Sequence, residues 1–288
     1  MEMWSILEKG LSWDEVLKYA SKSPEVGEWA KTVEERIKNS YVPYEAQKGM
    51  IEALRPKAME MWNILENPSN CLVSREEIEN YISQHSHLSD IQKEILRNKI
   101  NEYTANNIIK EHYIEGNSSD PLVMFFEGAV DDDEGYKQST GYHKDGRFKA
   151  MAVVIKEGKI VGVFTDASTL PDDPHNSDIA TAKEGVYKFN SGIHDDDYSA
   201  LRVNDGSTTP ATYGKDNVEG VATGINIHMG YNNDNPYKPT SKGCLIINKY
   251  TEYNDFAYAV GFKPKNITIT EGVKQYINVS GYVVIDRS

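Results

Sequence analysis

The chain has 288 residues, of which 39% are hydrophobic and 26% are charged, enough apolar content for one large folded domain or two ordinary ones. The net charge of −13 disfavours nucleic acid and anionic membrane surfaces as partners, because both attract cationic proteins. No apolar run approaches the roughly 18 residues that a membrane helix needs, so the sequence predicts no membrane span.

Residues 1–115 are expected to form a helical domain. They are rich in Glu, Lys, Ile and Leu and poor in Gly, and their apolar residues recur at intervals of three and four. Two Ser-x-x-Glu segments, Ser12–Glu15 and Ser74–Glu77, place a hydroxyl and a carboxylate at the spacing of a capping box. Each segment therefore predicts a helix start.

The helical part contains an internal repeat. Met1–Glu8 is identical to Met59–Glu66 at seven of eight positions, and a Ser-x-x-Glu segment follows each copy. Residues 1–20 are thus echoed at 59–82, which predicts a duplicated helix-turn-helix unit. A small helical bundle accounts for the repeat, and a docking or delivery module is the functional alternative.

The composition changes at residues 116–121, Gly-Asn-Ser-Ser-Asp-Pro, which is typical of a domain boundary. Residues 120–288 are rich in Gly, Val, Ile, Thr and Tyr, and Lys156–Lys159 separates two apolar runs as a hairpin turn does. Further strands are expected at residues 185–189, 222–228, 244–247, 267–270 and 276–285. The sequence therefore predicts an α+β protein in which a helical domain precedes a mainly β domain.

Cys244 and His228 are the candidate catalytic pair. His228 ends an apolar strand, a loop of 12 residues follows, and Ser241-Lys-Gly-Cys244 opens the next apolar run. An imidazole can take the proton of a thiol and leave a nucleophilic thiolate. The Gly243 amide can lie beside that of Cys244 and help to stabilise an acyl oxyanion. From the residues alone, a cysteine that fills the core and a histidine that is merely hydrogen-bonded remain alternatives.

Two motifs resemble those of the L,D-transpeptidase (YkuD-type) catalytic domain. The first is Ile227-His-Met-Gly230, followed by the loop and Ser241–Cys244. The second is Ala180–Phe189, which is similar to the family segment Thr-Pro-x-Gly-x-Phe/Tyr, with Ala182 in place of proline. The resemblance covers residues 146–250. It implies a β-sandwich-like catalytic domain with no metal and no organic cofactor.

The resemblance also implies roles for individual residues. Cys244 would attack a carbonyl of a peptidoglycan stem peptide, His228 would be the general base, and the backbone carbonyl of Met229 would orient the imidazole. The amides of Gly243 and Cys244 would form the oxyanion hole. The candidate substrate-binding residues are Ser241, Lys242, Asn248 and Tyr231.

The chain departs from the family pattern at two positions. Lys242 stands where a second histidine is usual, and Ile246 stands where Arg or Asn is usual. Asn248, one alternation further along the strand, is the candidate replacement for the second group. These departures leave the acceptor open between an amine of another stem, a free D-amino acid and water.

The sequence therefore favours a peptidoglycan-modifying cysteine acyltransferase. A catalytically inactive peptidoglycan-binding module is one alternative, and an unrelated cysteine protease with His194 or His175 as its base is another. Otherwise His194 is expected in a surface loop, beside an acidic run at residues 195–197 that is expected to be solvated, like the run at 131–134. Cys71 is expected to be structural.

The expected place of action is the periplasm or cell wall, although no signal peptide is visible. Export by a non-classical route, or removal of a signal, would explain how a chain with no visible signal peptide acts there. An effector delivered into a rival's periplasm would imply an immunity protein in the producer. The helical domain would then contact a component of the secretion system.

Overall fold

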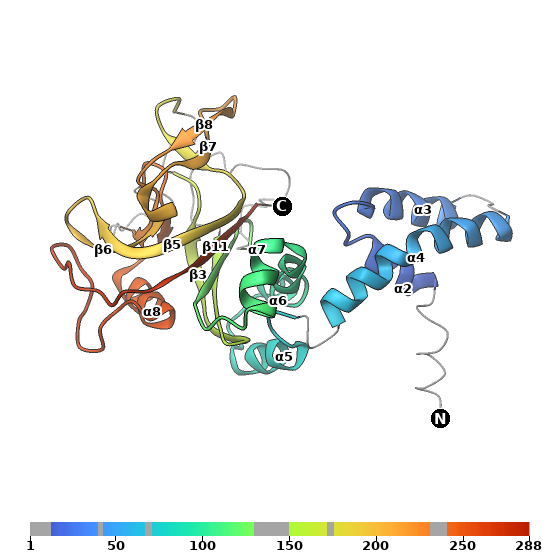
Figure 1. Ribbon diagram of the computed structural model, residues 1–288, viewed down its shortest axis with the longest axis horizontal. Coiled ribbons are helices and arrows are strands. Elements are labelled where there is room, and N and C mark those ends of the chain that lie inside the picture. The colour runs from blue at the N-terminus through green and yellow to red at the C-terminus, as the bar shows by residue number, and fades with distance from the viewer. Residues whose placement is uncertain are drawn as a thin grey trace.

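The computed structural model describes residues 13–39, 43–66, 71–129, 150–171, 176–230 and 241–287. Within these residues, α-helices accompany a β-rich region whose main sheet closes into an eight-stranded barrel (Figure 1). The prediction of a protein that mixes helices with a β-rich region is confirmed at that level. The main sheet is a closed barrel, where a β-sandwich-like arrangement was expected. The first copy of the repeat, Met1–Glu8, lies outside the described residues.

Among the described helices before the barrel, α5, α6 and α7 have side-chain caps at their first turn. The helical elements are α2 (Trp13–Ala20), α3 (Gly27–Asn39), α4 (Tyr44–Glu66), α5 (Arg75–Gln84), α6 (Asp90–Asn98), η2 (Ile100–Ala105), α7 (Asn107–Ile109) and η3 (Lys110–Glu115). At α5 the Ser74 hydroxyl accepts from the Glu77 amide, which confirms the predicted helix start. At α6 a complete capping box, not predicted from the sequence, joins Ser89 and Gln92.

These helices belong to two different hydrophobic cores. Helices α2, α3 and α4 pack on one another around residues such as Val16, Val33 and Leu54. Helices α5, α6 and α7 instead share a core with the barrel, and in Figure 1 they lie between the barrel and the α2–α4 group. The change of core therefore falls between Met61 and Leu72, well before the predicted boundary at residues 115–120.

The barrel order is β1-β11-β5-β6-β9-β10-β3-β2. Its strands are β1 (Leu122–Phe126), β2 (Ala150–Lys156), β3 (Lys159–Ser168), β5 (Gly185–His194), β6 (Tyr198–Val203), β9 (Asn226–Met229), β10 (Leu245–Ile247) and β11 (Ser280–Asp286). A second sheet contains β4 (Ala180–Ala182), β7 (Thr209–Tyr213) and β8 (Val218–Ala222), and helix α8 (Tyr250–Val260) follows β10.

Strand β1 shows how the barrel joins the helices. Alternate side chains of a strand point to opposite faces, and all five residues of β1 are buried. Both faces of the strand are therefore covered. Leu122, Met124 and Phe126 pack with helices α5 to α7. Val123 and Phe125 face the other core, to which helix α8 also contributes. A strand buried on both faces explains the continuous apolar run in the sequence.

Several predicted strand positions are confirmed, and others are wrong. The hairpin turn at residues 156–159 is present, with Glu157 and Gly158 at φ 50° and 73°. The strand expected at 222–228 is two strands, because Gly224 turns the chain between β8 and β9 at φ 72°. No strand forms at 267–270, and β11 begins only at Ser280.

Arg287 ties the end of β11 to the two segments beside it. Its guanidinium donates to the Ala182 carbonyl at 2.6 Å and to the Thr169 carbonyl and hydroxyl, both at 3.1 Å. Its amide donates to Glu184 Oε1 at 2.6 Å. Arg287→Ala is expected to lower the free energy of unfolding by about 2–3 kcal/mol, because the Ala182 and Thr169 carbonyls lose their charged hydrogen-bond donor.

Urea denaturation measures this loss, with Arg97→Ala as a matched control. Arg97 pairs with Glu79 at 2.7 Å, but both side chains are 44% exposed, so that change is expected to cost less than about 1 kcal/mol. Equal losses in the two variants would contradict a structural role for the Arg287 cluster.

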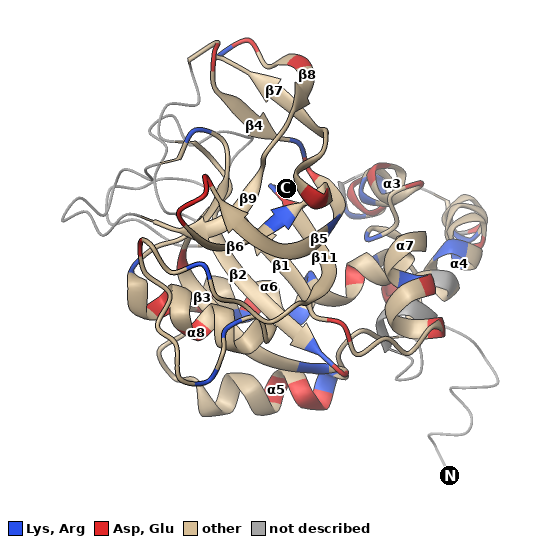
Figure 2. Cartoon of the chain, turned by 60° about the vertical axis from the view of Figure 1, so that its left-hand side comes forward, with Lys and Arg blue, Asp and Glu red and all other residues tan. Residues whose placement is uncertain are grey.

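Among the described helices, none combines the length and apolar character needed to cross a lipid bilayer. Figure 2 shows basic and acidic residues interspersed over the helices and the barrel on the side it presents, without a separate cationic face.

Candidate functional site

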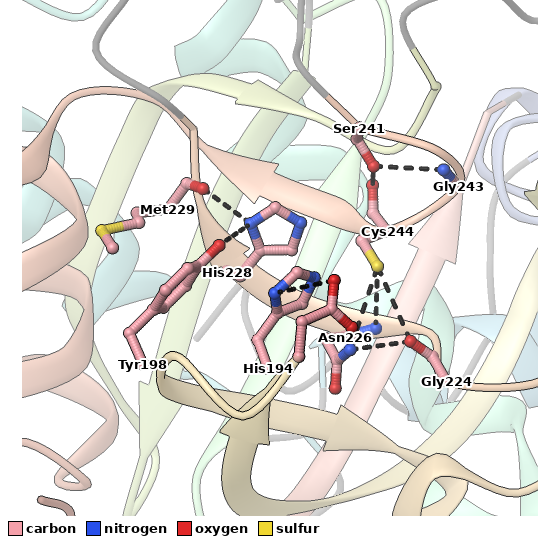
Figure 3. Close-up of polar contacts among 10 residues, drawn as sticks. His194, Tyr198, Gly224, Asn226, His228, Met229, Ser241, Gly243 and Cys244 are labelled. Atoms are coloured by element: carbon pink, nitrogen blue, oxygen red, sulfur yellow. Dashed lines mark hydrogen bonds and ion pairs between the residues drawn. The ribbon is translucent and has the colours of Figure 1, made fainter. Parts of the chain in front are cut away.

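The two motifs that carry the family resemblance meet in space. Strands β9 and β10 are parallel neighbours, with Ile227 opposite Leu245 and His228 opposite Ile246. Cys244, directly before β10, therefore lies opposite Asn226, and Asn226 and His228 point to the same face of β9. The barrel thus places the cysteine and the histidine side by side on adjacent strands (Figure 3).

The Cys244 thiol is half-buried and hydrogen-bonded to the first residue of β9 and to the turn before that strand. Its sulfur accepts from the Asn226 amide at 3.4 Å, lies 4.0 Å from Asn226 Nδ2, and donates to the Gly224 carbonyl at 3.7 Å. Burial raises the pKa of the Cys244 thiol to about 11, which the Asn226 donors only partly offset. The resting group is therefore a thiol at neutral pH.

The His228 ring is held in one orientation. Nδ1 lies 2.6 Å from the Met229 carbonyl and 3.0 Å from the Tyr198 hydroxyl. Since a carbonyl oxygen only accepts, Nδ1 carries the proton and Nε2 keeps its lone pair. The ring is 2% exposed, and burial, followed by the nearby His194, lowers the pKa of His228 to about 3. The resting imidazole is therefore neutral.

Three candidate catalytic atoms lie close together. Sγ of Cys244 and one ring nitrogen each of His228 and His194 lie within 4.8 Å of one another. Figure 3 shows the two rings and the sulfur facing a common space. By donor type these groups could accept a zinc ion, which takes His and Cys ligands. The same groups supply a thiol and two imidazoles for acid–base chemistry.

Ser241 and Gly243 shape the turn before Cys244. The Ser241 hydroxyl donates to the Cys244 carbonyl at 2.9 Å and accepts from the Gly243 amide at 3.1 Å. The Gly243 amide is thus already engaged, and its predicted role in an oxyanion hole would require Ser241 to release it. The Cys244 amide is the other donor that the predicted oxyanion hole would use.

The Ala180–Phe189 segment lies against this turn. A Cβ atom on Gly243 would come 2.5 Å from the Ala180 carbonyl oxygen. The two sequence motifs are therefore in direct backbone contact. Gly243 adopts φ 123°, a conformation that side-chain-bearing residues rarely adopt.

Other predicted site residues lie elsewhere. Lys242 is exposed. Asn248 is buried at the far end of β10, where its Nδ2 donates to Asp166 Oδ2 at 3.1 Å, so its side chain is committed to the fold. Tyr231 and His175 lie outside the described residues.

Three residues of the site were missed or placed differently by sequence reasoning. Asn226 could have been found, since it precedes His228 by two positions and so shares its strand face. Tyr198 carries no such local signal, because β6 joins β9 only through the sheet. His194 was expected in a surface loop, but it ends β5 and its side chain is buried.

Comparisons with protein-family models, with curated proteins and with solved structures each found no match for this chain.

The resting state of the thiol can be tested by alkylation. In a Cys71→Ser background, Cys244 is expected to react with iodoacetamide at pH 7 about 100-fold more slowly than in the urea-unfolded chain. The reason is that raising the pKa from 9.0 to about 11 reduces the thiolate fraction by about that factor.

Intact-mass spectrometry gives the rate, and the gap is expected to close as the pH rises toward 11. Asn226→Ala removes a donor to the sulfur and is expected to widen the gap. A native thiol that reacts faster than the unfolded one would show instead a preformed thiolate–imidazolium pair.

Proposed function

We propose that the chain is a cysteine acyltransferase that acts on peptidoglycan stem peptides through a thioester on Cys244. The observation that carries the proposal is the pairing of Cys244 and His228 on adjacent parallel strands, with His228 Nδ1 fixed on the Met229 carbonyl. That bond leaves the other ring nitrogen as a proton acceptor beside the thiol. The resemblance of both sequence motifs to L,D-transpeptidases supplies the substrate class.

The proposed reaction has two balanced steps. In the first, His228 takes the Cys244 proton, the sulfur attacks a stem-peptide carbonyl, and the C–N bond breaks as the leaving amine receives that proton. In the second, an amine or water attacks the thioester carbon, its proton passes to the enzyme, and the C–S bond breaks. Cys244 is restored as a thiol.

Asn226 supports the developing charge in this scheme. Its amide and Nδ2 both point at the sulfur, at 3.4 and 4.0 Å. Donors placed before the reaction stabilise a thiolate without reorganisation. Because the resting thiol donates to the Gly224 carbonyl, substrate binding is expected to turn the S–H away from that carbonyl and toward the imidazole.

The test is digestion of purified peptidoglycan sacculi, followed by mass analysis of the muropeptides. A new 3–3 cross-link would indicate transpeptidation, shortened stems would indicate hydrolysis, and exchange of the terminal residue would indicate D-amino-acid capping. The proposal fails if the profile is unchanged and no acyl adduct of Cys244 forms.

A peptidoglycan-binding module without catalysis is the second candidate. It is favoured by the raised pKa of Cys244 and by the Gly243 amide, which is engaged by Ser241. Sacculi that bind the protein in a pull-down yet keep their muropeptide profile would support it.

We further propose that the α2–α4 core serves delivery or docking of an exported effector, with an immunity protein as a partner in the producer. These helices form a core of their own, whereas α5 to α7 share that of the barrel. A protein beginning at residue 71 is therefore expected to keep its muropeptide activity in vitro and to lose delivery in competition assays. A truncation at residue 115 is expected to unfold the barrel, since it removes the helices packed on β1. Loss of activity from the residue-71 protein would count against a separate delivery role.

A further inference from the structure

We propose that His194 is a second general base of this site, which takes the proton of the incoming acceptor while His228 serves the thiol. The inference rests on the proposed acyl transfer and deepens it, because it assigns each of the two steps its own imidazole. In the second step the acceptor N–H or O–H proton moves to His194, the new bond to the acyl carbon forms, and the C–S bond breaks with its electron pair on sulfur. A proton from the imidazole pair then restores the Cys244 thiol.

The position of His194 is fixed by the sheet. His194 ends β5 and pairs in register with Tyr198 on β6, which in turn lies beside β9. Its ring stacks on Tyr198 at a centroid distance of 5.2 Å and lies 4.3 Å from the ring of His228 at a tilt of 42°. It is therefore held next to the pair rather than in the surface loop expected from sequence.

Two buried polar atoms at this site make no hydrogen bond within the described part of the chain. They are Nδ1 of His194 and Oδ1 of Asn226, on residues that are 9% and 5% exposed. Buried polar atoms are nearly always hydrogen-bonded in folded proteins, so these two unpartnered atoms, on residues whose side chains also lie beside the Cys244 thiol, point to a ligand. A peptide amide and an attacking amine or water offer the N–H and O–H groups that such atoms bind.

Titratable groups face His194 from four segments, one of which is the turn before β10 that carries Cys244. Asp195 and Asp197 lie in the turn that follows β5, with Asp195 Oδ2 3.7 Å from His194 Nδ1, while Tyr198 faces the ring from β6 and His228 from β9. Burial lowers the pKa of His194, and the two carboxylates oppose that shift. No carboxylate offsets the burial of His228, and its pKa falls to about 3.

The close approach of the rings limits the pair to one proton. Two imidazolium rings 4.3 Å apart would repel each other strongly in a buried site. When His228 has taken the thiol proton, His194 therefore stays neutral and does not compete. Once that proton has left with the amine, His194, next to Asp195, is the better acceptor for the second proton.

The experiment separates the two steps with a synthetic stem tetrapeptide as donor. In His194→Gln, the rate of thioester formation on Cys244, followed by quenched intact-mass spectrometry, is expected to stay within about threefold of the unmodified chain. Loss of the thioester to water or a free D-amino acid is expected to slow about 100-fold, so the acyl-enzyme accumulates. Hydroxylamine, which attacks thioesters without a base, is expected to restore the rate at which the thioester on Cys244 is lost.

Two outcomes would overturn the assignment. If His194→Gln slows thioester formation as much as its breakdown, or if hydroxylamine gives no rescue, the ring has a structural role or serves the thiol. One tightly bound zinc ion per purified chain, lost in His194→Gln, would make the rings ligands instead. His85→Gln, at the end of α5 and away from the site, is the matched control.

A second measurement stands apart from catalysis. In an NMR titration of the histidine ring protons, His194→Gln is expected to raise the pKa of His228, since it removes the positive charge that His194 carries when His228 titrates. Independent titration of the two rings would contradict the shared proton. If no thioester forms in the unmodified chain but the rings are coupled, the acyl-transfer proposal fails while the imidazole pair stands.

Discussion

Cys244→Ala is expected to reduce acyl transfer on peptidoglycan by at least about 1000-fold, because the covalent step has no other nucleophile at that position. The side chain is half-buried and its neighbours bond mainly to backbone atoms, so the fold is expected to survive. Muropeptide mass analysis gives the activity, and intact-mass spectrometry shows the loss of the acyl adduct.

Cys71→Ala is the matched control for that variant. Cys71 is the other of the chain's two cysteines and lies before α5, in the part of the chain that packs outside the barrel. Its replacement is expected to leave the muropeptide profile unchanged. Persisting activity in Cys244→Ala, with loss in Cys71→Ala, would reverse the assignment of the nucleophile.

The local part of the site could be predicted from the sequence. The His-x-Gly and Ser-x-Gly-Cys motifs end one strand and begin the next, and the alternation of strand side chains sets which residues share a face. That logic brings His228 and Cys244 together and also identifies Asn226. It fails for His194 and Tyr198, because their approach depends on β5 pairing with β6 and β6 pairing with β9, which no local spacing encodes.

Helix α8 was missed although its signal was present. Tyr253, Phe256, Ala257 and Val260 are buried on one side at helical spacing. No element was predicted for this segment, which lies in a part of the chain that was expected to be mainly β. Tertiary packing decided the outcome, since the same side chains fill the core beside β3 and β10.

The division of the helices between two cores could not be read from composition. Helices α4 and α5 are similarly rich in charged and aliphatic residues, yet Met61 faces the first core and Ile78 faces the barrel. The clue lies instead in β1, whose unbroken apolar run needs a covering layer on each face. A run of that kind at the predicted domain boundary implies that the preceding helices belong to the barrel.

Gly243→Ala is expected to lower the free energy of unfolding by about 2–4 kcal/mol and to suppress acyl transfer along with it. Two effects add. The backbone at φ 123° is strained for any residue with a Cβ, and that Cβ would meet the Ala180 carbonyl oxygen at 2.5 Å. Neither atom belongs to a flexible side chain, so the turn that holds Cys244 must move away from β4.

Gly272→Ala separates the two effects. Gly272 also has a positive φ, of 79°, but an added Cβ would have nothing within 4 Å, so only the backbone cost of about 1 kcal/mol applies. Urea denaturation measures both variants, and the excess loss in Gly243→Ala reports the contact with Ala180. Equal losses would mean that the turn relaxes freely. The glycine before the nucleophile would then serve the amide geometry at Cys244 rather than the contact between the two motifs, and acyl transfer would fall without a matching loss of stability.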